Sequence, residues 1–117
     1  MSTKSPECWA SDPQARGLRI EISAEHSLLL PFDQFVFAEL TTDGEGQCLR
    51  LMFATHEIKA HGQSLRRLET AMQRLELSFL ASLPTGHRSL VADGQPVVRE
   101  IAVTEVKDDP NRQAESG

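Results

Sequence analysis

The sequence predicts an α+β domain in which an antiparallel, curled sheet of six or seven short strands packs on one amphipathic helix. The expected chain order is four or five strands, the helix, and then two strands. Two observations lead to this prediction. Apolar residues within 63–83 recur at gaps of three and four, which places them on one face of a helix. Elsewhere, apolar residues alternate with polar ones in short runs bounded by turn residues, as in half-buried strands.

The predicted helix buries one apolar stripe and begins and ends at recognisable signals. The stripe consists of Leu65, Leu68, Met72, Leu75 and Phe79. Ser64 stands where an N-cap residue would accept a hydrogen bond from a free amide of the first turn. Leu83 precedes a proline, and a residue in that position is disfavoured in the α conformation, so the helix is expected to end there.

This helix would leave a second apolar surface facing outward. With the stripe turned inward, Leu77 lies on the far side, and Leu80 lies toward the same flank. The aliphatic part of Arg74 is close to both. We therefore expect Arg74, Leu77 and Leu80 to form a contact surface for a homodimer or for a protein partner.

Six further segments are predicted as strands: residues 18–23, 27–30, 33–40, 48–55, 88–92 and 97–106. The segment 33–40 is apolar on both faces, which favours a central position in the sheet. The polar loop 41–46 is expected to connect it to 48–55 as a hairpin. Residues 56–60 fit either a fifth strand or the start of the helix.

Length and composition favour one domain. The 117 residues are divided into a mobile leader (1–17), an α+β domain (18–107) and a disordered tail (108–117). The leader is rich in Ser, Pro, Asp and Gly, with Trp9 as its large apolar residue. The tail lacks apolar periodicity.

Net charge and the two cysteines indicate which classes of partner are excluded and which cellular compartment is expected. The net charge of −5 argues against a domain that neutralises nucleic-acid phosphates. No run approaches the roughly 18 apolar residues that a membrane span requires, and no signal peptide is recognisable. Cys8 and Cys48 are best interpreted as two free thiols in a reducing compartment. We expect a cytoplasmic protein, from a bacterium, that contacts neither nucleic acid nor membrane.

The sequence contains no convergent set of reactive groups, so no catalytic residue, metal ligand or cofactor is expected. His56 and His61 are separated by four residues, a spacing that turns their rings apart on a helix and to opposite faces on a strand. Cys48 lies on an alternating strand, where a cysteine is commonly a small apolar residue. The loop 43–46 carries two acids, which would repel a phosphate.

These observations favour a small noncatalytic interaction or regulatory module, and a homo-oligomer is one form that such a module takes. The alternative is a small ligand-binding domain or enzyme that uses His26, His56 or His87 at the edge of the sheet. Two histidines in one cleft with Cys48 or an acidic residue would favour the alternative, whereas scattered histidines would favour the module.

Overall fold

The chain forms two four-stranded β-sheets and one short α-helix in a computed structural model that describes residues 8–44, 46–83 and 94–106. Sheet A has the strand order β1 (Trp9–Ser11), β7 (Leu77–Ala81), β2 (Gly17–Ser23), β3 (His26–Pro31). Sheet B has the order β4 (Phe35–Asp43), β5 (Gly46–Phe53), β6 (His56–Gln63), β8 (Val97–Glu105). A 3-10 turn, η1 (Phe32–Gln34), joins the sheets, and α1 spans Arg66–Gln73.

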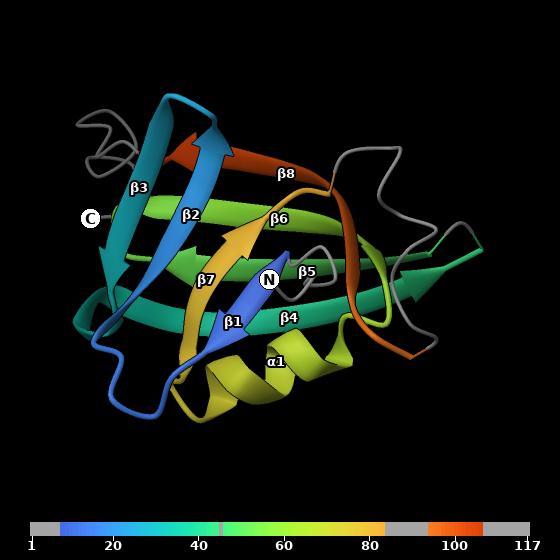
Figure 1. Cartoon of the computed structure of the whole chain (residues 1–117), viewed down its shortest axis with the longest axis horizontal. Helices are drawn as coiled ribbons and strands as arrows, with labels where there is room; N and C mark the ends of the chain where they lie inside the picture. Colours follow the sequence, from blue (N-terminus) through green and yellow to red (C-terminus); the bar gives the residue numbers. More distant parts are fainter. Residues whose placement is uncertain (1–7, 45, 84–93, 107–117) are drawn as a thin grey trace, which may run out of the picture.

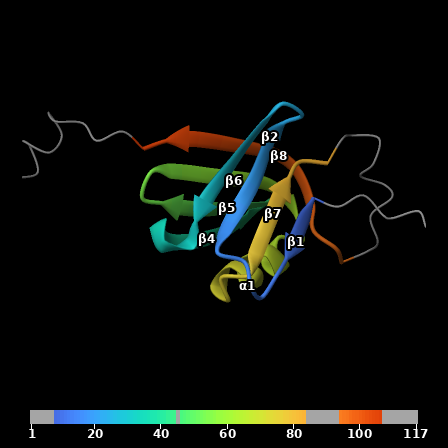
Figure 2. The same ribbon diagram turned by 60° about the vertical axis from the view of Figure 1, so that its left-hand side comes forward.

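The two sheets form successive layers with the core between them. Sheet A lies across one face of sheet B, and the strands of the two layers run in different directions (Figures 1 and 2). Helix α1 runs alongside β4 (Figure 1). Both sheets and the helix contribute side chains that are inaccessible to solvent, among them Leu18, Ile20, Leu49, Leu51, Ile58, Leu65, Leu68 and Met72. The burial of this apolar area is the main stabilising contribution.

The expected fold class is therefore wrong. The fold is two sheets facing each other with one helix of 8 residues beside them, and not a curled sheet packed on a long amphipathic helix. The sheets are also not purely antiparallel, because β2 and β7 pair in parallel, with Ile20 opposite Leu80. This parallel pair joins segments more than fifty residues apart in the chain, and such pairing leaves no signal in a local pattern.

The predicted helix is correct only for its first half. Leu65, Leu68 and Met72 are fully buried, as the stripe requires. The helix ends after Gln73, however, and the chain re-enters sheet A as β7. The N-cap expectation is also wrong, because Ser64 has a φ of 58° and makes no cap. Instead, the backbone N–H of Leu65 donates to Oε1 of Gln47 on β5 at 2.7 Å.

The strand predictions for 18–23, 27–30, 48–55 and 97–106 are confirmed to within a few residues at their ends by β2, β3, β5 and β8. The hairpin between β4 and β5 is confirmed as well. Residues 56–60 belong to a strand, β6, and not to the helix. The central position expected for 33–40 is wrong, since β4 is an edge strand of sheet B. The predicted strand 88–92 and the tail 108–117 lie outside the described residues.

Residues 8–17 are also not a mobile leader. Trp9–Ser11 form β1, which pairs with β7, and the Cys8 side chain is 1% exposed. The Cys8 thiol donates a hydrogen bond to the carbonyl oxygen of Pro96 at 3.4 Å. The leader therefore provides an edge strand of sheet A. Within the described residues, no helix is long and apolar enough to cross a membrane.

Deleting residues 1–12 is expected to destabilise the fold, because it removes β1 and exposes the edge of β7. We expect the melting temperature to fall by about 5 °C or more, corresponding to roughly 1 kcal/mol. The exposed change Ser11→Ala in the same strand is the control and should alter the free energy of unfolding by less than about 0.5 kcal/mol. Circular dichroism would measure the melting temperatures of the truncated and full chains. Equal values would contradict a structural role for β1.

Candidate functional site

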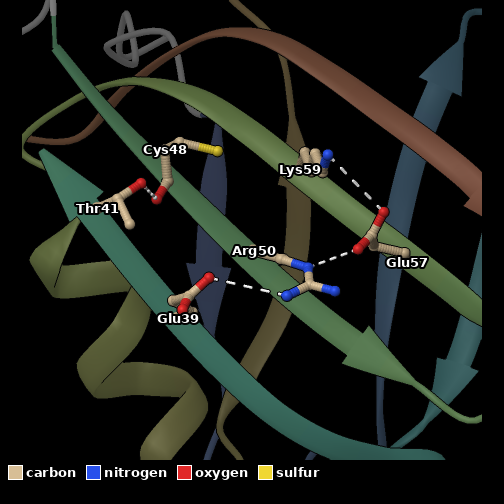
Figure 3. A network of polar contacts seen from close by, with 6 residues as sticks. All are labelled: Glu39, Thr41, Cys48, Arg50, Glu57 and Lys59. Atoms are coloured by element: carbon tan, nitrogen blue, oxygen red, sulfur yellow. Dashed lines mark hydrogen bonds and ion pairs between the residues drawn. The ribbon is translucent and has the colours of Figure 1, made fainter. Parts of the chain in front are cut away.

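Arg50 is at the centre of a polar network on the outer face of sheet B, the face turned away from sheet A. The antiparallel register places Arg50 on β5 between Glu39 on β4 and Lys59 on β6. Its guanidinium contacts Glu57 through Nε and Glu39 at 3.8 Å (Figure 3). The same group lies 5.1 Å from the centre of the Phe37 ring, within the range of a cation–π contact.

Two charged members of this network, Glu39 and Lys59, are exposed to solvent. Glu39 is 57% exposed and Lys59 is 48% exposed, so their ion pairs are screened by water and contribute little stability. Phe37 is 40% exposed, and Met52 lies opposite it in the register. The outer face of sheet B therefore presents apolar and oppositely charged groups side by side.

Cys48 and His61 are neighbours on the same face. They lie directly opposite each other on β5 and β6, and the Cys48 Sγ is 3.9 Å from the His61 Nε2. Glu100 is opposite His61 on β8, so the three residues form one row across three strands. From the sequence, His61 was compared only with His56, so the Cys48–His61 pair was not predicted. A detectable signal existed, because a tight turn at 54–55 places residues whose numbers sum to 109 opposite each other.

The Cys48 thiol is not activated as a nucleophile. Partial burial raises its pKa above the ordinary value of 9.0, the nearby Asp43 and Glu39 raise it further, and Lys59 and Arg50 act in the opposite sense. The thiol is therefore protonated at neutral pH, whereas catalytic cysteines have a lowered pKa. This property does not support an enzyme that would use the Cys48–His61 pair for covalent catalysis.

The rate of Cys48 alkylation should reflect this raised pKa. We expect iodoacetamide to modify Cys48 more slowly than free glutathione at pH 7 in metal-free protein, with a rate that keeps rising above pH 9. Peptide mass spectrometry separates Cys48 from Cys8, whose own pKa is raised by burial. A rate that reaches its plateau below about pH 8 would contradict the assignment of a protonated thiol.

The histidines of the alternative hypothesis are not brought together in the described part of the chain. His26 begins β3 in sheet A and borders a shallow polar hollow near Glu21 and Glu25. His56 begins β6 in sheet B, and its Nδ1 lies 2.8 Å from the Thr55 hydroxyl. His87 lies outside the described residues. His26 and His56 are on different sheets, so these two do not form the cleft that the alternative requires.

The three residues of the predicted contact surface, Arg74, Leu77 and Leu80, lie in different surroundings in the structure. Arg74 is the C-cap of α1 and is exposed. Leu77 and Leu80 belong to β7, and both are 0% exposed within the protein's own core. The physical reason is the early end of the helix, because a strand at 77–81 turns these leucines between the sheets. Leu77 and Leu80 are therefore part of the core and do not lie on an outer helical face.

An apolar groove lies instead between β4 and α1. Its volume is about 590 Å³, and it is open to solvent on one side. The groove is lined by Phe35, Ala38, Glu69, Met72, Gln73 and Leu75. We call it the β4–α1 groove. Val36 and Phe37 on β4 beside it are 60% and 40% exposed. No strand pairs with the outer edge of β4 in the part of the chain that the structure describes.

Leu75 at the end of this groove has an unfavourable conformation. The backbone N–H of Leu75 donates to Met72, and that of Glu76 donates to Ala71 at 2.8 Å, which together make a Schellman helix end. Leu75 occupies the position of that motif that usually holds glycine, with a φ of 55°, and its side chain is 42% exposed. A leucine with this φ costs roughly 1–2 kcal/mol, so stability alone does not explain the residue.

Comparison with known proteins adds no further assignment. No family model matches the chain, and neither the curated proteins nor the solved structures include a significant match. Within residues 8–44, 46–83 and 94–106, no group of three or more His, Cys, Asp or Glu side chains is placed to hold a metal ion. The candidate surfaces are therefore the β4–α1 groove and the outer face of sheet B.

Proposed function

We propose that this protein is a noncatalytic interaction module that binds an extended, basic and apolar segment of a partner protein in the β4–α1 groove. This proposal rests on one observation: an open apolar groove borders the edge of β4, with which no strand pairs among the described residues. An extended peptide can add to such an edge through backbone hydrogen bonds while its side chains enter the neighbouring hollow. The volume of about 590 Å³ is within the range of roughly 300–1,000 Å³ found for binding sites.

Charge favours a basic partner segment. The charged side chain that lines the groove is Glu69. Strand β4 contains no lysine or arginine, and Asp33 precedes it in η1. Lysine or arginine residues flanking a large apolar side chain would complement this distribution, and like charges would be repelled.

Leu75 supports the same assignment. At this backbone position, which usually holds glycine, an exposed leucine raises the free energy of the folded state. Such strain is found at functional sites, where another requirement outweighs stability. In the proposed complex, the Leu75 side chain covers the apolar residue of the partner. Both described cysteines are free thiols, which is in keeping with the reducing cytoplasm as the place of action.

Peptide selection with matched variants tests this proposal. A random-peptide phage library would be selected on the immobilised protein, and the enriched peptides would be titrated by fluorescence anisotropy. We expect sequences with a large apolar residue flanked by lysine or arginine. Leu75→Gly should weaken binding at least about tenfold, while its melting temperature stays equal or rises because the strain is relieved. Leu29→Ala, which shortens a 62% exposed leucine on β3, is the control and should bind normally.

Three outcomes would overturn the proposal. The first is enrichment of acidic peptides, and the second is binding that survives Leu75→Gly unchanged. The third is a dimer in light scattering that Leu75→Gly dissolves, because this result would assign the groove to a second copy of the chain.

A further inference from the structure

The Cys48–His61 pair on the outer face of sheet B has the geometry of a metal-binding half-site. Tetrahedral zinc binds cysteine sulfur at about 2.3 Å and histidine nitrogen at about 2.0–2.1 Å, which separates the two ligand atoms by roughly 3.5 Å. The Cys48 Sγ and the His61 Nε2 are 3.9 Å apart without a metal. Side-chain movements of a few tenths of an ångström would bring the sulfur and the nitrogen to the separation of two zinc ligands.

The sheet holds this pair in place. Both residues lie on interior strands of sheet B, since β5 pairs with β4 and β6, and β6 pairs with β5 and β8. Their direct opposition in the register places the two side chains on one face of the sheet. His61 is exposed and Cys48 is half-buried, so a cation can reach both atoms from solvent. The pair is thus preorganised and accessible.

Glu100 places a carboxylate next to His61, on the side where the second ring nitrogen of a metal-binding histidine commonly donates a hydrogen bond. It lies opposite His61 on β8, on the side away from Cys48. Histidines that bind metal through one ring nitrogen commonly donate a hydrogen bond from the other nitrogen to a carboxylate. The row Cys48, His61, Glu100 therefore provides a sulfur ligand, a nitrogen ligand and an adjacent carboxylate in the order suited to that role.

One copy of the chain supplies two ligands, whereas a structural zinc site has four. We propose that Cys48 and His61 bind zinc as half of a Cys2His2 site that a second copy of this chain completes across a two-fold axis. A two-fold axis through the metal repeats the same two ligands and joins identical faces. This site is distinct from the β4–α1 groove and does not depend on the proposed function.

The surrounding face is suited to contact with a copy of itself. Arg50 and Lys59 alternate with Glu39 and Glu57 on it, so each charge can oppose one of opposite sign on the second copy. Phe37 and Met52 add apolar area, and Phe37 is 40% exposed. The four charged residues occupy the face shown in Figure 3, where Cys48 precedes Arg50 on β5.

Zinc titration of the full chain tests the proposal. Metal-free protein, reduced with a phosphine that does not chelate zinc, would be titrated with zinc chloride and followed by light scattering after size exclusion. We expect the mass to double as zinc reaches about one ion for two chains. Cobalt in place of zinc should give the absorption of tetrahedral cobalt and of cobalt–thiolate bonds. Cys48→Ser and His61→Gln should each abolish the doubling and the thiolate absorption.

His56→Gln changes a histidine on the same strand and is the matched control, which should dimerise as the wild type does. Leu75→Gly should also dimerise, which separates this site from the groove. Failure to take up zinc, or uptake that persists in Cys48→Ser, would overturn the proposal. Uptake of one zinc per chain without a change in mass would overturn the completion of the site by a second copy.

Discussion

Gly62→Ala is expected to be the most damaging single substitution. A Cβ built on Gly62 would lie 1.8 Å from the carbonyl oxygen of Val97, a backbone atom that cannot move aside without separating β6 from β8. The register of this pair is irregular between His61 and Gly62, so the two backbones approach closely there. We expect a loss of at least about 3 kcal/mol in the free energy of unfolding, or failure to fold.

Gly44→Ala is the control for this prediction, because nothing lies within 4 Å of a Cβ at that position. It should change the free energy of unfolding by less than about 0.5 kcal/mol. Urea titrations followed by tryptophan fluorescence compare the two variants. Similar midpoints for both would contradict the close approach of β6 and β8.

Leu68→Ala is expected to have the second largest effect, a loss of about 2 to 5 kcal/mol. Leu68 is 0% exposed at the middle of α1, among the side chains that join the helix to the core. Removal of its branched end leaves a cavity, because the two sheets on either side of the core cannot collapse to fill it.

Arg67→Ala is the neighbouring control. Arg67 is exposed and donates one long hydrogen bond to Gln95 at 3.3 Å, so its loss should cost less than about 0.5 kcal/mol. The same urea titrations measure both variants. Equal losses at positions 67 and 68 would mean that the buried face of α1 is assigned incorrectly.

The two candidate surfaces are on different parts of the molecule and take different ligands. The β4–α1 groove is apolar with an acidic rim, and it lies at the edge of sheet B. Cys48 and His61 lie on interior strands of the same sheet. A protein that dimerises through zinc on this face would present two grooves, so a partner with two basic segments would bind with increased avidity. Leu75→Gly and Cys48→Ser distinguish the two contributions.

The sequence by itself determined those elements whose pattern is local. Alternation identified β2, β3, β5 and β8, and the gaps of three and four identified the buried stripe of α1 as far as Met72. These patterns are reliable because one face of each element is buried along its whole length, which imposes the period of the element on its residues.

Tertiary pairing decided the rest. Phe79 on β7 continues the helical spacing by coincidence, because residues 77–81 form a strand that pairs with β1 on one side and with β2 on the other. Strand pairing joins distant segments through backbone groups that every residue carries, so it overrides a weak local preference and leaves no mark in the sequence. For the same reason, the division into two sheets and the β4–α1 groove arise only when the strands are assembled.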